Sequence, residues 1–149
     1  MRETTELPVP TKRQNRIVST WAGEHRFDTG RAGGPVSRID ASAQTGQSPV
    51  DTLLSALATC TSVDVVDILA KRRTPLASLE VEAVGDRKDG IPARITRIHL
   101  TYRMAGDGIE RAHAERAVEL AVTKYCSVRD SLDPQLPVEW TVVIEGEPA

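Results

Sequence analysis

The alternation of apolar and polar side chains changes period along this chain, which separates predicted strands from predicted helices. In several segments every second side chain is apolar, as in a half-buried strand, and β-branched residues are frequent there. A glycine-rich stretch around Arg31, with the sequence DTGRAGGP, is expected to form a loop between two of these strands. The predicted strands are residues 16–21, a segment that begins at residue 25, and residues 36–41, 79–84, 94–104 and 138–145.

After residue 48 the pattern becomes helical. Ser48 can cap a first helical turn, and Pro49 suits the first helical position because its missing N–H would have no partner there. The segment that follows, up to residue 74, is apolar nearly all round, which predicts burial nearly all round. To bury its apolar surface, a helix of this kind needs to pack against a large sheet, a partner subunit or both. A second helix is predicted over residues 110–124 and a short helical turn over residues 127–132.

The order of these elements is three strands, a long helix, two strands, a helix and one strand. Runs of strands between helices favour an α+β fold over an alternating α/β sheet. A length of 149 residues fits one domain. Residues 1–14 are polar and contain two prolines, so we predict a flexible N-terminal arm there and a single domain over residues 15–149.

Composition narrows the class of protein. Hydrophobic residues make up 40% and charged residues 27%, which is ordinary for a globular domain. The net charge of −2 argues against a nucleic-acid-binding protein. We find no uninterrupted run of 18 apolar residues and no apolar core of a secretory signal, so we expect a cytoplasmic protein with no membrane contact. The three histidines follow no metal-binding pattern, and we expect neither a metal nor another cofactor.

The two cysteines are the candidates for chemistry. Two are too few for a disulfide scaffold or a structural zinc site, so they are either catalytic or simply buried. Cys60 lies in the long apolar helix, where a free cysteine can be an ordinary small core residue. Cys126 follows the second helix, at a point where a further helix N-terminus would stabilise a thiolate. They are 66 positions apart, and the spacing does not show whether they approach each other.

The segment SPVDTLLSALATCTSVDVVDIL, followed much later by KYCSV, resembles the OsmC/Ohr family of thiol-dependent peroxidases. The resemblance extends over about residues 16–145, and the sequence around Cys60 looks more like the OsmC-like branch than the Ohr enzymes. It implies an OsmC-like α+β fold, with antiparallel sheets wrapped around long central helices in an intertwined homodimer. The active sites would lie at the subunit interface.

The resemblance also implies a chemistry. Cys60 would be the peroxidatic cysteine that reduces an organic or small hydroperoxide and becomes a sulfenic acid. Cys126 would be the resolving cysteine that condenses with it to a disulfide. A dithiol reductant of the lipoyl type, or a small thiol, would restore the pair without a metal or flavin.

In this family an arginine favours the thiolate, and an acidic residue holds the arginine. Arg31 matches the arginine, and Arg38 is the other candidate nearby. Ohr enzymes have a glutamate directly after the helix-start proline, where this chain has Val50; its acid, Asp51, comes one position later. Asp51 would lie about 180° around a regular helix from Cys60, so it either orients the arginine or caps the helix.

Asp64 lies one turn after Cys60, on the same face of the predicted helix. It either positions the arginine or is an ordinary charge of the helix surface.

Two other functions remain open on the sequence. One is a non-catalytic homodimeric binding module, which the apolar Val50 at the usual acidic position would favour. The other is a thiol redox sensor that forms a disulfide without a dedicated substrate. Consumption of peroxide with a dithiol would distinguish the enzyme from both.

Overall fold

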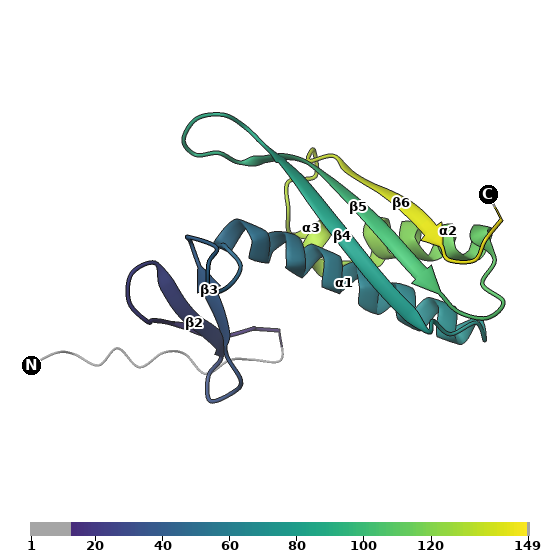
Figure 1. Ribbon diagram of the computed structural model, residues 1–149, viewed down its shortest axis with the longest axis horizontal. Helices are drawn as coiled ribbons and strands as arrows, with labels where there is room; N and C mark the ends of the chain where they lie inside the picture. The colour runs from purple at the N-terminus through teal and green to yellow at the C-terminus, as the bar shows by residue number, and fades with distance from the viewer. Residues whose placement is uncertain (1–12, 149) are drawn as a thin grey trace, which may run out of the picture. The chain divides into compact units, whose positions relative to one another are not determined.

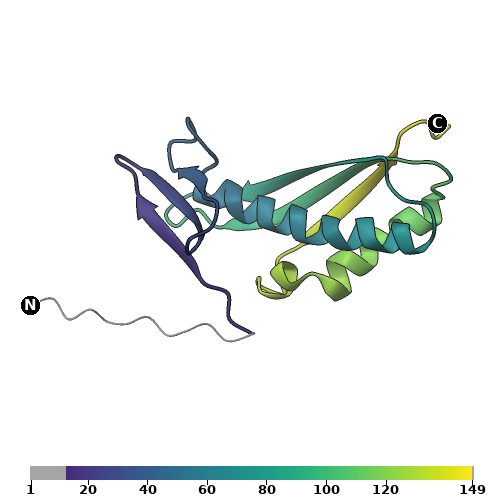
Figure 2. The same cartoon turned by 90° about the horizontal axis from the view of Figure 1, so that it is seen from below.

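The computed structural model describes residues 13–148, which form two compact units that divide at Thr52 and Leu53 (Figures 1 and 2). Each unit contains a three-stranded sheet, and a long helix begins in the first unit and continues in the second. The α+β class is therefore confirmed, as is the predicted order of strands and helices. The predicted arm lies outside the described residues except for Arg13 and Gln14, and a single domain over residues 15–149 stays a prediction.

The first unit is an antiparallel meander of β1 (Ile17–Trp21), β2 (Arg26–Arg31) and β3 (Ser37–Asp40). The glycine-rich stretch was expected to be a loop, but its first four residues belong to β2. Gly30 lies inside β2, where the backbone of Pro35 approaches it closely. A Cβ at this position would lie 2.3 Å from the carbonyl oxygen of Pro35, so only glycine fits.

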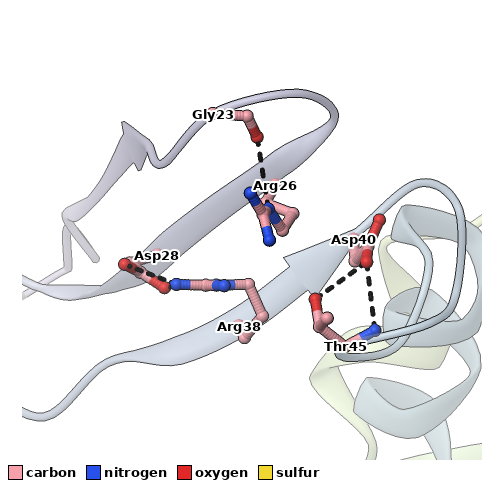
Figure 3. Close-up of polar contacts among 6 residues, drawn as sticks. All are labelled: Gly23, Arg26, Asp28, Arg38, Asp40 and Thr45. Atoms are coloured by element: carbon pink, nitrogen blue, oxygen red, sulfur yellow. Dashed lines mark hydrogen bonds and ion pairs between the residues drawn. The ribbon is translucent and has the colours of Figure 1, made fainter.

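The only buried residue among the described residues of the first unit is a carboxylate, Asp40. It accepts a hydrogen bond from the N–H of Ser42 at 2.9 Å. It also accepts hydrogen bonds from the N–H and the hydroxyl of Thr45, at 3.0 and 2.8 Å (Figure 3). The hydroxyl of Thr45 and these backbone N–H groups lower the pKa of Asp40 from 3.8 to about 2. The carboxylate thus fixes the loop that leads into the long helix.

The long helix α1 (Pro49–Lys71) starts where the sequence predicts. Ser48 Oγ accepts the N–H of Asp51 at 3.1 Å, and Asp51 Oδ2 accepts the N–H of Ser48 at 3.0 Å. This reciprocal capping box satisfies two N–H groups that the helix leaves without internal partners. Asp51 therefore caps the helix, one of the two roles that the sequence left open.

One stripe of α1 is buried: Leu57, Ala58, Thr61, Val65 and Leu69, spaced as one helical face. The side of the helix away from this stripe is not covered, and the exposed fractions of Val63 and Val66 there are 60% and 43%. Burial all round is thus wrong for a single copy of the chain. On length and composition alone α1 could cross a membrane. Its buried stripe nevertheless belongs to the apolar core of the second unit, so α1 is a core helix.

The sheet of the second unit has the order β4 (Ser78–Arg87), β5 (Ile95–Ala105), β6 (Val138–Ile144). β4 and β5 are antiparallel, whereas β5 and β6 are parallel, so the expectation of antiparallel sheets is wrong for this second sheet. A parallel pair needs a crossover connection, which here consists of helix α2 (Arg111–Leu120), the π-helical turn η1 (Ala121–Tyr125) and the short helix α3 (Ser127–Asp130).

Both α1 and α2 lie on one face of this sheet, as the two views show (Figures 1 and 2). The core between them includes Leu57 from α1, Leu100 from β5 and Val118 from α2, all fully buried. Alternate residues of β5 point into it, as the sequence predicts. The second predicted helix, however, is not uniform, because its last turn is π-helical. That turn ends at Cys126.

Candidate functional site

The two cysteines, distant in sequence, meet in the second unit. Cys60 lies in the middle of α1 and is partly exposed, and Cys126 follows η1 and is 3% exposed. Both are free thiols, and the thiol of Cys60 lies near enough to the thiol of Cys126 to raise its pKa. This proximity is what the spacing of 66 residues left open.

The π-helical turn determines where the thiol of Cys126 lies. The N–H of Cys126 donates to the carbonyl oxygen of Ala121 at 3.0 Å, five residues back, and Cys126 itself has an extended backbone. Its sulfur then accepts the N–H of Arg129 at 3.2 Å, so Cys126 caps the next short helix. Single π-helical turns within helices occur frequently at functional sites.

Opposing influences act on the acidity of Cys126. Burial raises the pKa of its thiol, and the N–H of Arg129 opposes this by stabilising the thiolate. The neighbouring thiol of Cys60 raises the pKa further, and the net direction is upward from 9.0. At neutral pH Cys126 is therefore protonated when both cysteines are reduced.

A buried tyrosine ties α1 to β5 next to this pair. The hydroxyl of Tyr102, which is fully buried, hydrogen-bonds with Thr61 Oγ1 on α1. Thr61 Oγ1 also lies 3.0 Å from the carbonyl oxygen of Leu57, which can accept its one proton, so Tyr102 donates to Thr61. The pKa of Tyr102 rises to about 12, mainly through burial and also through the nearby Cys126. Thr61 directly follows Cys60 in the sequence.

Tyr102 lies in the strand predicted over residues 94–104, and the sequence pattern gave it no further role. A signal was present: a buried tyrosine hydroxyl needs a partner, so an inward tyrosine predicts a polar residue on the facing element. The sequence does not identify that partner as Thr61.

A cavity of about 330 Å³ adjoins Cys126. Its charged lining residues are Lys124, Arg129 and Asp130. The guanidinium of Arg129 donates to carbonyl oxygens of Asp133 and Leu136 at 3.0 and 2.9 Å, which holds it against the wall. The remaining lining residues are Val122, Thr123, Leu132, Pro134, Val138 and Trp140.

The two candidate arginines lie in the first unit. Arg31 is the exposed last residue of β2 and lines a cavity of about 310 Å³ there. Arg38 is instead held by Asp28, with Nε 2.7 Å from Oδ1, and the pair raises the pKa of Arg38 and lowers that of Asp28 (Figure 3). Arg31 therefore has the more accessible guanidinium of the two.

The acidic candidates differ in position. Asp51 is occupied in the capping box, and Asp64 lies half-buried on α1, one turn after Cys60. Of the predicted site residues, the structure thus brings together the two cysteines. The catalytic roles of Arg31 and Asp51 stay predictions.

A metal centre has no candidate in residues 13–148, where no group of three or more His, Cys, Asp or Glu side chains could hold an ion. The chemistry that the described residues offer is that of two neighbouring thiols.

Comparison with known proteins agrees with this fold. The family model described as OsmC-like protein matches residues 41–141. Protein YhfA of Escherichia coli K12 is 37% identical over 81 residues, which are 54% of this chain and 60% of that protein. The chain therefore spans about 60% of the length of the curated relative that it matches.

Solved structures show the same arrangement of elements. An OsmC-like protein from Mycoplasma pneumoniae superimposes with a TM-score of 0.76 at 15% identity, covering 90% of this chain and 99% of that one. The organic hydroperoxide resistance protein OhrB of Bacillus subtilis superimposes with a TM-score of 0.55 at 15% identity, covering 87% and 96%. At 15% identity, the structural similarity to these two proteins shows a shared fold and nothing about activity.

Proposed function

The chain belongs to the OsmC-like family, and from this premise we propose that it is a thiol-dependent peroxidase that reduces organic hydroperoxides. Cys60 is the peroxidatic cysteine and Cys126 the resolving cysteine. The observation that supports this proposal most is the proximity of the two thiols, since Cys60 is near enough to raise the pKa of Cys126. A sulfenic acid on one would have a thiol beside it with which to condense.

The different environments of the thiols support this division of roles. Cys60 is partly exposed, so a peroxide can approach its sulfur. Cys126 is buried, and its raised pKa keeps it protonated at neutral pH, which makes it a poor first nucleophile. A buried thiol beside Cys60 is instead suited to a second step that needs no access for the substrate.

The reaction has two steps before the reductant acts. The thiolate of Cys60 attacks the O–O bond of the hydroperoxide, and with one proton this yields an alcohol and the sulfenic acid of Cys60. Cys126 then attacks that sulfur, water leaves, and the Cys60–Cys126 disulfide forms. A dithiol reduces the disulfide, with two electrons passing from the dithiol to the protein.

Arg31 and Asp51 complete the proposed site. Arg31 favours the thiolate of Cys60 through its positive charge; its exposure, in contrast to the ion-paired Arg38, supports it over the alternative. Asp51 acts as a positioning residue, because its capping box fixes the first turn of the helix that carries Cys60. The protein works as a cytoplasmic homodimer in which the exposed side of α1 meets a second copy.

The test is single-turnover oxidation with cumene hydroperoxide, followed by mass spectrometry of each cysteine. Cys60→Ser is expected to abolish alcohol formation, because a serine hydroxyl is not ionised near neutral pH. Cys126→Ser is expected to form one equivalent of alcohol and to leave a sulfenic acid on Cys60 that a dimedone probe labels. Equal reactivity of Cys60→Ser and the parent protein would overturn the proposal.

Arg31→Ala is expected to slow the first oxidation without abolishing it, since the sulfur remains while the charge is lost. Arg38→Ala is the matched control, and its oxidation rate should stay close to that of the parent protein. If only Arg38→Ala slows oxidation, Arg38 and not Arg31 is the arginine that favours the thiolate of Cys60.

The proximity of the thiols equally supports a second candidate, a thiol redox sensor. A sensor would form the same disulfide but would not turn over. Steady-state consumption of hydroperoxide with an excess of a dithiol separates the two: the enzyme, whose disulfide the dithiol reduces rapidly, consumes many equivalents of peroxide per chain, whereas a sensor whose disulfide resists the dithiol consumes about one.

A further inference from the structure

The proposed disulfide has two sulfur atoms, and a reductant could attack either. Thiol–disulfide exchange depends on which sulfur the incoming thiolate can reach and on the leaving group. The cavity of about 330 Å³ in the second unit is lined by Cys126 but not by Cys60. Its volume is in the range of small-molecule sites, roughly 300–1,000 Å³.

We propose that this cavity is the binding site of the reductant, and that a small thiol placed there attacks the sulfur of Cys126 and expels Cys60. The inference rests on the proposed disulfide but goes beyond it, because it assigns a site and a direction to the reductive step. Cys126 is one of the lining residues and Cys60 is not, so a thiol bound in the cavity lies nearer to Cys126.

The leaving group supports the same direction. Burial raises the pKa of Cys126, and a thiol of higher pKa leaves less readily as thiolate. Attack on Cys60 would have to expel Cys126 into its apolar surroundings. Attack on Cys126 expels Cys60, which is partly exposed.

The reductive sequence balances with a dithiol as the only reductant. The first thiolate bonds to the sulfur of Cys126 while the Cys60–Cys126 bond breaks, and Cys60 leaves as thiolate. The second thiolate of the same molecule then attacks its own sulfur in the mixed disulfide, so that Cys126 leaves and takes up a proton. The dithiol ends as a cyclic disulfide and the protein has gained two electrons.

The charges of the cavity wall indicate the class of thiol. Two cations, Lys124 and Arg129, face one carboxylate, Asp130. The excess of positive charge favours a thiol that carries a carboxylate over one that carries an amine. The Cys126 thiol itself is neutral before oxidation and adds no opposing charge once it is in the disulfide.

The deciding experiment maps the mixed disulfide on the full chain. The disulfide is prepared in two ways, with one equivalent of cumene hydroperoxide and with diamide. Each preparation is treated briefly with 3-mercaptopropionate, and an excess of N-ethylmaleimide is then added to trap the free thiols. We expect 3-mercaptopropionate on Cys126 and maleimide on Cys60. The reverse labelling, or an even division, overturns the proposal. If diamide forms the disulfide and the hydroperoxide does not, the peroxidase function fails, while the mapping still tests this site.

Variants test the cavity itself. Thr123→Trp places a bulky side chain in the lining and is expected to slow reduction of the disulfide at least tenfold. Ser127→Trp is the matched control, because Ser127 is also exposed but does not line the cavity, and its reduction rate should be unchanged. An equal rate for Thr123→Trp and the parent protein overturns the proposal.

Charge selectivity gives an independent readout. Per thiolate, the parent protein should react faster with 3-mercaptopropionate than with cysteamine, and Lys124→Glu should reverse or abolish that preference. A preference that Lys124→Glu does not change would contradict the assignment of the thiol class.

Discussion

Asp40 is the only buried residue among residues 13–52, whereas the second unit encloses a continuous apolar cluster contributed by α1, α2 and its own sheet. The first unit is ordered by polar contacts such as the Asp40 loop and the Asp28–Arg38 ion pair. The second is ordered by apolar burial, with Leu100 and Tyr102 fully enclosed. The difference shows which part of the chain one copy can stabilise on its own.

The apolar residues of the first unit make the same point. Trp21 and Phe27 are register partners on neighbouring strands and so share one face of the sheet, and their exposed fractions are 66% and 40%. A three-stranded sheet becomes stable when an apolar face is covered. The face of Trp21 and Phe27 and the uncovered side of α1 therefore both favour assembly with a second copy.

The largest effect is expected from loss of a core side chain in the second unit. Leu100→Ala should lower the free energy of unfolding by about 2–5 kcal/mol, because it removes buried apolar surface and leaves a cavity. Val84→Ala, on the neighbouring strand and 49% exposed, is the matched truncation and should cost less than about 1 kcal/mol. Urea unfolding of both variants checks this; equal costs would contradict the role of the buried apolar cluster in stabilising the second unit.

The next effect concerns the uncovered side of α1. Val63→Glu should raise the dissociation constant of the proposed homodimer at least about a hundredfold, or about 2.8 kcal/mol, because it would place a charge in the proposed apolar interface. Val63→Ile keeps the surface apolar and should leave the dimer intact. Sedimentation velocity across a concentration series measures this, and a parent protein that is monomeric at micromolar concentration would overturn the dimer.

A smaller effect is expected at the tyrosine beside the thiols. Tyr102→Phe removes the donor to Thr61 and should cost about 0.5–1.5 kcal/mol. If this bond also keeps Cys60 against Cys126, the disulfide yield after one equivalent of hydroperoxide should fall and sulfinic acid should rise. Tyr125→Phe, at a tyrosine that is 50% exposed, is the control. An unchanged product ratio in Tyr102→Phe would limit the bond to a structural role.

The smallest effect should be confined to the first unit. Asp40 has a pKa near 2 in the folded protein and 3.8 as its ordinary value, so its ionised form favours folding. Its contribution should be complete above about pH 4, decline as the pH falls towards 2 and vanish below that. Asp40→Asn should therefore weaken protection of the amides in residues 26–47 from hydrogen exchange at pH 7, with the difference from the parent shrinking towards pH 2. A difference that is constant with pH would contradict this account.

The local elements could be predicted because their causes are local. Alternation predicted the strands, and Ser48 with Pro49 predicted the start of α1 at its correct residue. The extent of β2 was wrong, because a glycine inside a strand is indistinguishable by sequence from a glycine in a loop. The carbonyl of Pro35 that forbids a side chain at Gly30 is found only in the folded backbone.

By itself, the sequence determined the α+β class, the order of elements, the family resemblance and the identity of the two candidate thiols. Only the tertiary structure decided that these thiols are neighbours, that a π-helical turn presents Cys126 beside a cavity, and that Tyr102 donates to Thr61. The spacing of apolar residues along a helix or strand indicates which side of that one element is apolar. It carries no information about which residue of a distant element packs against it, and that pairing brings Cys60 and Cys126 together.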